Sequence, residues 1–392
     1  MFKFLQYAFL LLLLFYVPSV AQIDKNQIIH LIIKLDKQRV LKDANEFLRL
    51  KPVTITAFKA SRSAGGIHDY YSEGDYWWPN PRDPSGPYIR RDGLTNPNNF
   101  DKHRLALRNM SIQVAALTAA YKMTHEKKYA HKALENLLAW FVNKNTFMNP
   151  NLKYAQAIKG ITTGRGIGII DTIHLVEVAQ AVMVLERTGY LNHKDAEEIK
   201  EWFRKYLNWL TTGKFGKDER DNGNNHSTCW VMQVAEYAKL VGDTSEMNYC
   251  RNFYKNVLLP DQMASNGSFP KELARTKPYG YSIFNMEAMS MVCQILSDKD
   301  HDLWHYATKN GKSIALGMKF LFPFLKDKSK WKYPKDVMYF NDWPVRQTSL
   351  LFCGLHLGVK KYIDLWKTLN PEPKVEEIIR NFPIRQPILW IN

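Results

Sequence analysis

The chain has 392 residues and a formal net charge of +16, with 45% hydrophobic residues and four cysteines. The cysteines, Cys229, Cys250, Cys293 and Cys353, are widely spaced without a CxxC pair, which excludes a disulfide scaffold and a zinc ribbon. So strong a positive charge favours contact with a polyanion. Because no zinc-finger, basic-zipper or aromatic RNA-binding signature is present, we expect no nucleic acid partner.

The N-terminus reads MFKFLQYAFLLLLLFYVPSVAQ, with one early lysine, an apolar run and small residues before Gln22. This order is typical of a secretory signal peptide. A retained membrane anchor is the alternative, but the apolar run is short of the ~20 residues that a membrane span needs. We therefore expect a signal peptide at residues 1–21 and a mature, periplasmic or secreted protein of one domain, residues 22–392. We expect no membrane association after signal removal, and a monomer.

Helical periodicity dominates the remaining sequence, and strand patterns are weak. A nearly all-apolar helix followed by an amphipathic one is predicted in residues 110–141, 173–210, 230–258 and 285–318, with a further apolar helix at 347–358. An all-apolar helix is buried on every side, whereas an amphipathic helix keeps one face exposed. The irregular spacing argues against a short-period solenoid. The pattern therefore predicts an all-α fold, an α/α toroid or incomplete barrel of helical hairpins with the apolar helices inside.

Each predicted inner helix follows a loop that is rich in aromatic, amide, arginine or histidine residues. Because the inner helices of such a ring run in the same direction, their N-terminal loops gather at one face. The loop RDNGNNHST, residues 220–228, places Asn224, Asn225 and His226 directly before an apolar run. Helix N-termini offer free backbone N–H groups and a positive dipole end. The sequence therefore predicts a site for an acidic ligand at this face.

Asn225, His226, Arg275 and Tyr281 are the candidate catalytic residues, and they suit β-elimination on a uronate polymer. In that reaction the C5 proton is removed and the C4–O bond breaks, but this proton is weakly acidic while the neighbouring carboxylate stays charged. Amide, imidazole and guanidinium donors can neutralise the carboxylate as negative charge spreads onto it. A tyrosine can serve as acid, base or both, because nearby cationic groups lower its pKa from about 10.

The motifs NNHSTCW, residues 224–230, and FPKELARTKPYGYSIFN, residues 269–285, resemble those of alginate lyases with α/α-toroid folds. His226 and Tyr281 are 55 residues apart, and Arg275 precedes Tyr281 by six. GDYWWPNP and TTGRGIGIIDT make the chain more similar to polysaccharide lyase family 38 than to family 5. The resemblance extends from about residue 66 to residue 346.

The resemblance implies a role for each of the four candidate catalytic residues. Asn225 would neutralise the carboxylate together with His226. Tyr281 would be the general acid, and also the base for mannuronate and glucuronate, while His226 would be the base for guluronate. Arg275 would keep the Tyr281 oxygen partly ionised. We expect no cofactor and no metal.

Further residues are candidates for substrate binding. Trp77 and Trp78 can stack on sugar rings, and Arg165, in a glycine-rich loop, can hold a carboxylate. The other candidates are Asn224, Tyr279, His68 and Arg346. Asp171 and His174 lie three residues apart and could ligate a metal, but a buried hydrogen bond is the favoured interpretation because no third ligand is apparent.

The combined prediction is a secreted polysaccharide lyase whose partner is an acidic polysaccharide, alginate and/or glucuronan. Two alternatives stay open at this point. A glycoside hydrolase on a similar toroid needs a pair of carboxylates, and Asp69, Glu73, Asp75 and Asp171 are available in the loops. A binder of acidic glycans without catalytic activity is the other alternative.

Overall fold

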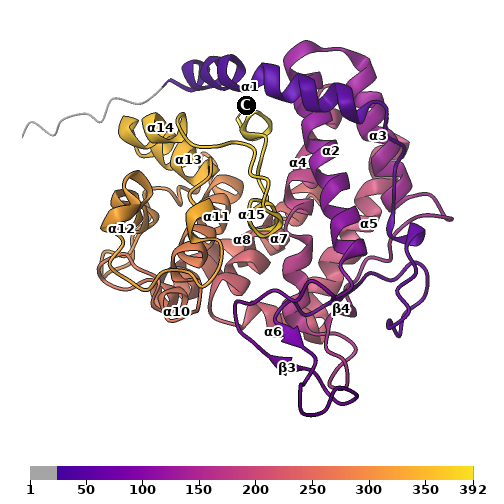
Figure 1. The fold of residues 1–392 in the computed structure, drawn as a ribbon. Coiled ribbons are helices and arrows are strands. Elements are labelled where there is room, and N and C mark those ends of the chain that lie inside the picture. Colours follow the sequence, from indigo (N-terminus) through magenta and orange to yellow (C-terminus); the bar gives the residue numbers. More distant parts are fainter. Residues whose placement is uncertain (1–23, 392) are drawn as a thin grey trace, which may run out of the picture.

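The structure is a computed structural model, and it describes residues 24–391. The predicted signal peptide lies outside the described residues, so its removal stays a prediction. Figure 1 shows the helices arranged as a ring, with the C-terminal segment, in yellow, running into its middle. Over the described range, the four cysteines are buried free thiols.

An inner wall of buried helices confirms the predicted fold class, an α/α toroid. Each helix of this wall contacts the next one along the chain. In the described part of the chain the wall comprises α2 (Lys102–Thr124), α4 (Leu175–Arg187), α7 (Asn225–Val241), α11 (Pro278–Leu296) and α13 (Thr348–His356). Nearly every residue of α7 and α11 is buried, as expected for helices enclosed on all sides.

A second layer of amphipathic helices covers the inner wall. In α5 the buried residues Ile199, Phe203 and Leu207 recur at four-residue intervals, which places them on one face of the helix. The covering helices are α1 (Lys25–Phe47), α3 (Lys127–Phe141), α5 (His193–Thr212), α8 (Thr244–Phe253), α12 (Ile314–Lys326) and α14 (Lys360–Trp366). Beyond α2 the ring continues through α1 and the 3-10 helix η6 (Pro387–Trp390), which contacts α1, α2 and α4.

One predicted helix boundary is wrong. The expected hairpin at residues 285–318 is interrupted, because α11 ends at Leu296 and α12 begins only at Ile314. The intervening sequence contains Asp298 and Asp302, whose carboxylates accept hydrogen bonds from backbone N–H groups two and three residues further on. Such local bonds favour turns over a helix.

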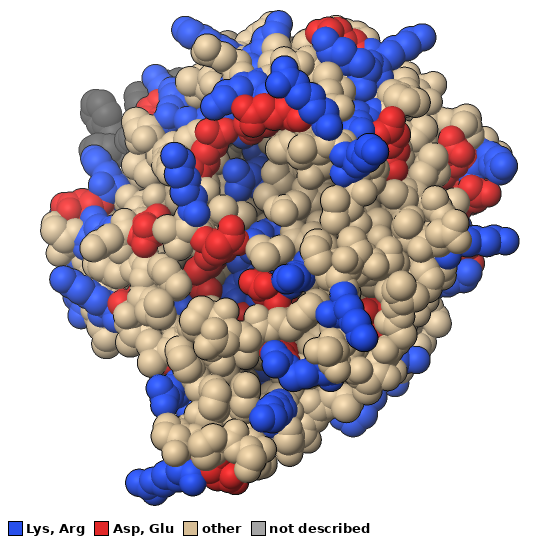
Figure 2. Space-filling view, turned by 45° about the vertical axis from the view of Figure 1, so that its right-hand side comes forward, with Lys and Arg blue, Asp and Glu red and all other residues tan. Residues whose placement is uncertain are grey.

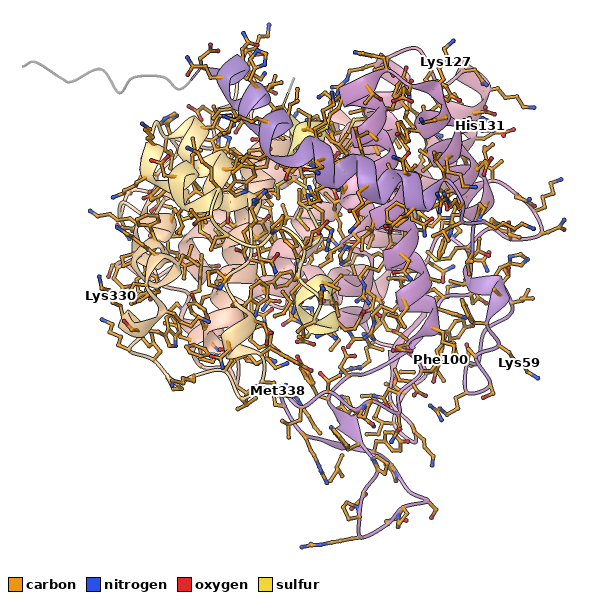
Figure 3. All side chains as sticks on the ribbon, turned by 45° about the horizontal axis from the view of Figure 1, so that its top comes forward. Lys59, Phe100, Lys127, His131, Lys330 and Met338 are labelled. Atoms are coloured by element: carbon orange, nitrogen blue, oxygen red, sulfur yellow. The ribbon has the colours of Figure 1, made fainter. Side chains whose placement is uncertain are left out.

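Short strands hold the loops at one end of the toroid. β1 (Tyr71–Glu73) pairs in parallel with β4 (Tyr154–Ala157), and β2 (Trp77–Trp78) pairs antiparallel with β3 (Ile89–Arg90). In Figure 3 the loop with β2 and β3 projects from the end of the molecule where Phe100 and Met338 are labelled. The remaining short elements are η1 (Ile55–Ala57), η2 (Gly166–Thr172), α6 (Lys214–Arg220), the π-helix η3 (Tyr254–Leu258), α9 (Leu259–Gln262), α10 (Pro270–Leu273), η4 (Lys328–Lys330), η5 (Phe340–Asp342) and α15 (Glu376–Arg380).

Polar side chains cap the inner helices where they meet this end. The Asn224 side chain accepts a hydrogen bond from the His226 backbone N–H at 3.0 Å and so caps α7. The Asp336 carboxylate accepts from the N–H groups of Tyr279 and Gly280, at 2.8 Å each, in the first turn of α11. These caps satisfy N–H groups that have no partner within a helix, and they fix where each helix begins.

Candidate active site

A cavity of about 410 Å³ opens at the face where the N-termini of α7 and α11 meet. Its wall is completed by the segment around β2, by the loop before η2 and by the C-terminal residues Arg380 and Asn381. The structure brings together in this cavity the predicted residues Trp77, Arg165, Asn224, Asn225, His226, Arg275 and Tyr281. The predicted convergence of loops therefore produces a shared cavity with both positive and negative groups.

Asn225 is held in place by a buried carboxylate, Glu272 of α10. The Asn225 backbone N–H donates to Glu272 Oε1 at 2.7 Å, and Asn225 Nδ2 donates to Glu272 Oε2 at 2.6 Å. Burial raises the pKa of Glu272, and the two hydrogen bonds from Asn225 oppose that rise. Because the amide nitrogen carries two hydrogens, Asn225 keeps one N–H for a ligand in the cavity.

His226 is held by a second buried carboxylate, Glu219 of α6. His226 Nδ1 lies 2.8 Å from Glu219 Oε1, and the Glu219 side chain is fully buried. Burial raises the pKa of Glu219, and His226 opposes that rise. With Nδ1 engaged by Glu219, Nε2 is the ring nitrogen that remains for a ligand.

Tyr281 lies in the first turn of α11 and shares a hydrogen bond with a second tyrosine. Its hydroxyl is 2.7 Å from the hydroxyl of Tyr76, and the Arg275 guanidinium lies 4.7 Å from the centre of its ring. Burial raises the pKa of Tyr281 to about 12, although Arg275 lowers it in part. This corrects the expectation that Arg275 keeps the Tyr281 oxygen partly ionised, because loss of water outweighs the nearby charge.

Arg275 is oriented by Asp92, from the loop after β3. Arg275 Nη2 lies 3.1 Å from Asp92 Oδ1, and the Thr276 hydroxyl donates to Asp92 Oδ2 at 2.9 Å. Arg90 pairs with the same carboxylate at 2.6 Å. Asp92 therefore links the projecting loop to the start of α11 and fixes Arg275 beside Tyr281.

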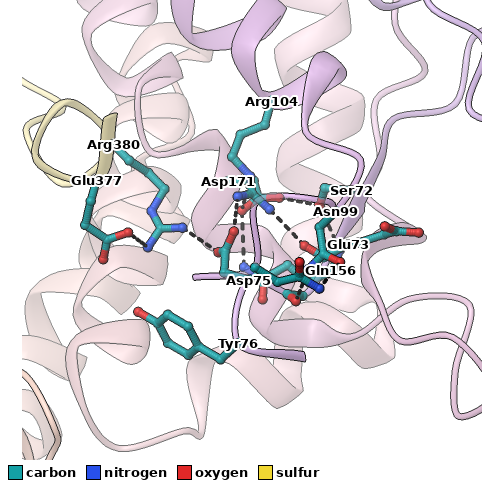
Figure 4. Close-up of polar contacts among 12 residues, drawn as sticks. Ser72, Glu73, Asp75, Tyr76, Asn99, Arg104, Gln156, Asp171, Glu377 and Arg380 are labelled. Atoms are coloured by element: carbon teal, nitrogen blue, oxygen red, sulfur yellow. Dashed lines mark hydrogen bonds and ion pairs between the residues drawn. The ribbon is translucent and has the colours of Figure 1, made fainter. Parts of the chain in front are cut away.

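A buried ionic network forms the floor of the cavity (Figure 4). Asp75 accepts from Arg104 at 2.5 Å and pairs with Arg380, which also pairs with Glu377 at 2.7 Å. Lys277 pairs with the other oxygen of Glu377 at 2.9 Å. The network joins the loop between β1 and β2 to α2 and α15, so the C-terminal segment takes part in building the site.

Asp75 gives this network a pH dependence. Burial alone would raise the pKa of Asp75, but Arg104 and Arg380 lower it to about 2. A carboxyl group with a depressed pKa stabilises the fold above its unfolded pKa of about 3.9, and the contribution is lost as the pH falls towards 2. We expect Asp75→Asn to cost about 3–5 kcal/mol at pH 7, because Arg104 and Arg380 each lose one of their two carboxylate partners. Urea unfolding at pH 7, 4 and 2.5 should show a difference from the parent that narrows with acid; a constant difference would contradict this assignment.

Asp171 and His174 both have polar partners within the protein, which fits the favoured interpretation of a buried hydrogen-bond network. Asp171 accepts hydrogen bonds from Tyr70, Ser72 and Gln156 and pairs with Arg104 at 3.3 Å. His174 Nε2 contacts the carbonyl oxygen of Arg380 at 3.0 Å. Within residues 24–391, no group of three or more His, Cys, Asp or Glu side chains is arranged to hold a metal ion. Both residues therefore serve the buried hydrogen-bond network.

The two adjacent tryptophans have different surroundings. Trp77 lines the cavity, and the Arg165 guanidinium lies 5.8 Å from its ring centre. Trp78 lies outside the cavity lining, and its indole N–H donates to the carbonyl oxygen of Leu94 at 2.9 Å. Arg91 lies 5.3 Å from the Trp78 ring centre. Trp77 is thus placed to meet a ligand, whereas Trp78 pins the projecting loop.

Besides Trp78, three further predicted binding residues lie away from the cavity, and these predictions are corrected. Tyr279 is fully buried, and its hydroxyl donates to the carbonyl oxygen of Phe324 at 3.0 Å. His68 stacks on Phe147, with ring centres 4.6 Å apart. Arg346 pairs with Asp36 of α1 at 2.9 Å. Each side chain is engaged in packing rather than in the cavity.

The carboxylates proposed for a hydrolase are also unsuitable. Asp69 and Glu73 do not line the cavity, and Glu73 pairs with Arg62. Asp75 and Asp171 do line it, but Arg104 neutralises both of them. A glycosidase needs one carboxyl group that keeps its proton and another that is free to react, so this cavity does not provide the pair.

Several cavity residues were missed by the sequence analysis. Tyr76 lies beside Tyr281, and Gln156, Arg90, Arg380 and Asn381 complete the wall. Tyr76 directly precedes the two tryptophans and carried a local signal, since its aromatic, polar-loop context is the same as theirs. Arg380 and Asn381 lie far along the chain in a short polar segment, and no local pattern distinguishes them.

Comparisons with known proteins agree with this geometry. The sequence profile of the family described as Alginate lyase matches residues 54–331. The structure is similar to that of an alginate lyase from Bacteroides ovatus, with 29% identity and a TM-score of 0.78, covering 93% of this chain and 95% of that one. It also shares the fold of alginate lyase A1-III from Sphingomonas species A1, with 16% identity, a TM-score of 0.56, and 90% and 94% of the two chains covered. A search of curated protein sequences finds no significant match.

The toroid and its cavity of amide, imidazole, guanidinium and phenol groups define a polysaccharide lyase. More particularly, the chain belongs to the alginate lyase family, whose profile covers more than half of its length. This membership favours a lyase over the two alternatives left open by the sequence, a hydrolase and a binder without activity.

Proposed function

We propose that this protein cleaves uronate-containing polysaccharides, alginate and/or glucuronan, by β-elimination. The observation that carries the proposal is the arrangement of one cavity: Asn225 and His226 lie at the start of α7, Tyr281 lies in the first turn of α11, and Arg275 lies in the segment before α11. A uronate bound between the two helices would present its carboxylate to the first pair and its C4–O bond to Tyr281.

Carboxylate neutralisation is the first task. The free N–H of Asn225 and Nε2 of His226, when protonated, are donors towards the substrate carboxylate. Glu272 and Glu219 hold these donors from behind. Because the donors are fixed before the reaction, they stabilise the developing enolate without reorganising.

Proton transfer is the second task, and Tyr281 carries it. In mannuronate and glucuronate the C5 hydrogen and the C4 oxygen lie on the same face, so ionised Tyr281 can take the C5 proton. The electron pair forms the C4–C5 double bond as the C4–O bond breaks, and Tyr281 returns the proton to the leaving oxygen. In guluronate the two groups lie on opposite faces, so neutral His226 takes the proton while Tyr281 donates its own.

The comparisons support a polymer of this class. One similar structure is an alginate lyase A1-III variant with a bound tetrasaccharide, at 15% identity and a TM-score of 0.59, covering 90% of this chain and 94% of that one. The net charge of +16 also favours an acidic polymer. Figure 2 shows Lys and Arg spread widely over one face, with a hollow that has charged side chains at its rim.

The site is proposed to work as a monomeric, exported enzyme. Among residues 24–391 no single helix is long and apolar enough to cross a membrane; Gly166–Thr172 and Leu175–Arg187 pass that test only together, with a 45° bend between them. Export rests on the N-terminal sequence, and N-terminal sequencing of protein recovered outside the cytoplasm should find a start near Gln22.

An absorbance assay tests the proposed activity. Elimination creates a C4–C5 double bond conjugated to the carboxylate, which absorbs ultraviolet light, whereas hydrolysis or binding creates none. The purified protein should produce this absorbance with polymannuronate, polyguluronate or glucuronan, and less with hyaluronan, chondroitin or heparin. No increase with any uronate polymer would refute the proposal.

A further inference from the structure

The arginines of the cavity differ in how their charge is balanced. Arg90 and Arg275 share the carboxylate of Asp92, and Arg380 pairs with Asp75. In contrast, no described carboxylate oxygen lies within 4.0 Å of Arg165, whose hydrogen bonds go to the carbonyl and side-chain oxygens of one residue, Gln156. Arg165 is therefore the cavity-lining arginine, in the described structure, that lacks an ion-pair partner.

Arg165 is nevertheless held firmly. Its Nε donates to the Gln156 carbonyl oxygen at 2.9 Å and its Nη2 to Gln156 Oε1 at 3.2 Å. Gln156 itself has a φ of 49°, a conformation that non-glycine residues rarely adopt and that is commonest at functional sites. On the other side Trp77 packs against the guanidinium, and Gly74 leaves room for it, since a Cβ there would lie 2.7 Å from Nη2.

The positive charge of Arg165 is only partly balanced by carboxylates. Burial and the like charge of Arg90 lower the pKa of Arg165 to about 10, while Asp171, Asp75 and Glu219 raise it from a longer distance. Arg165 therefore stays charged at neutral pH. A guanidinium that has lost water without gaining a carboxylate is stabilised when an anion enters the cavity. Its Nη1 makes no hydrogen bond in the described structure and is not enclosed by protein, so it is available to such an anion.

The fold places Arg165 beside the His226 end of the cavity. Arg165 directly precedes η2, and η2 packs against α6, the helix that carries Glu219. Around the ring, η2 leads from Arg165 into α4, while His226 and Tyr281 lie in the first turns of α7 and α11; α4 contacts α7, and α7 contacts α11. Neighbouring helix axes lie about 8–10 Å apart. In this order Arg165 enters the cavity from the α4 side of Asn225 and His226, whereas Tyr281 enters it from α11.

We propose that Arg165, braced by Gln156 and Trp77, binds the carboxylate of a second uronate adjacent to the one that is cleaved. The proposal rests on the proposed function for the orientation of the polymer. In alginate or glucuronan every sugar carries a carboxylate, so both sites are filled at once. In hyaluronan a neutral hexosamine follows each uronate, and the neighbouring position offers Arg165 no carboxylate. Arg165 would thereby select polymers of consecutive uronates.

Binding measurements without turnover test this assignment. In the full-length Tyr281→Phe protein, we expect Arg165→Gln to weaken the binding of tetramannuronate by about 10–100-fold, the range for a lost charge-assisted hydrogen bond. Calorimetric titrations at several salt concentrations should also show a shallower salt dependence, because one ion pair is missing. Arg165→Lys should recover part of the affinity. The control Arg49→Gln, at an exposed position after α1 that does not line the cavity, should change neither the affinity nor its salt dependence.

The comparison with hyaluronan tetrasaccharide decides where the second carboxylate lies. Arg165→Gln should leave the affinity for that ligand within about twofold of the parent, or leave both proteins without binding. An equal loss on both ligands, an unchanged affinity for tetramannuronate, or a loss with unchanged salt dependence would each overturn the assignment. These titrations do not depend on product formation, so a failure of the ultraviolet assay would refute the proposed reaction while the role of Arg165 is judged separately.

Discussion

Tyr281→Phe is expected to lower the turnover of every uronate polymer by about 10²–10⁴-fold, the usual contribution of a general acid or base. The change removes one hydroxyl and leaves the buried ring in place. Without that hydroxyl, no group at the start of α11 can return a proton to the leaving oxygen. Initial rates of ultraviolet product formation on polymannuronate and polyguluronate measure the effect.

Tyr279→Phe is the matched control for this experiment. Tyr279 lies two residues away on the same helix, but its hydroxyl bonds to the carbonyl oxygen of Phe324 in the core. Its loss should cost about 1 kcal/mol of stability and leave turnover close to that of the parent. If Tyr279→Phe is inactive and Tyr281→Phe is active, the assignment is wrong by two residues; if both are active, the tyrosine mechanism fails.

The pKa of Tyr281 adds a pH signature. Burial raises it to about 12, so the phenol keeps its proton at neutral pH in the free protein. Where Tyr281 acts as base, only its ionised form reacts, and the rate on polymannuronate should rise with pH through the neutral and alkaline range. Tyr76, whose own pKa burial raises well above 10, can donate to the ionised Tyr281 oxygen at 2.7 Å. Where His226 is the base, Tyr281 needs its proton, and this alkaline rise should be absent.

The helical ring could be predicted because its signal is local. Apolar runs such as that of α7 and amphipathic ones such as α5 differ in residues that lie within two or three turns of each other. The interruption after Leu296 was missed because the turn depends on aspartates that bond to the backbone, in a stretch that is otherwise rich in helix formers. The order of the helices around the ring follows the order of the hairpins along the chain.

The candidate site was only partly predictable, and the reason lies in long-range contacts. Asn225 and His226 stand out in the sequence, but their partners Glu272 and Glu219 resemble ordinary helix glutamates until the fold buries them. Tyr279 and Tyr281 carry the same local signal, although they are two positions apart on α11. The helix turns by about 200° over two residues, which sends Tyr279 into the core and leaves Tyr281 facing the cavity.

The electrostatics of the site were the least predictable part. Arg275 lies against Tyr281 as expected, yet the balance between its charge and the loss of water is decided by burial, which only the folded chain reveals. The same holds for Asp75. Its pairing with Arg104 and Arg380 joins segments that are about 30 and about 300 residues away along the chain.

His226→Ala is expected to lower the rate on polyguluronate at least about tenfold more than the rate on polymannuronate. On guluronate the variant loses the base that takes the C5 proton, which costs about 10²–10⁴-fold, in addition to a carboxylate donor. On mannuronate only the donor is lost, because Tyr281 takes the proton there. The rates of the variant and the parent on both homopolymers, measured with the same enzyme preparations, give the ratio of the two losses. Equal losses on both polymers would show that His226 is not an epimer-specific base.

Glu219→Gln separates the two roles of His226 further, because it leaves the imidazole in place. The Glu219 carboxyl group, 2.8 Å from Nδ1, engages that nitrogen and leaves Nε2 facing the substrate. A glutamine of the same shape replaces the carboxyl group that orients the imidazole, so the rate on polyguluronate should fall about tenfold or more. The rate on polymannuronate should also fall, since the imidazole that meets the substrate carboxylate is then less firmly oriented. If the Glu219→Gln protein is as active as the parent on both polymers, Glu219 only packs against His226. Any difference between the two epimers would then depend on Nε2 of His226 without help from Glu219.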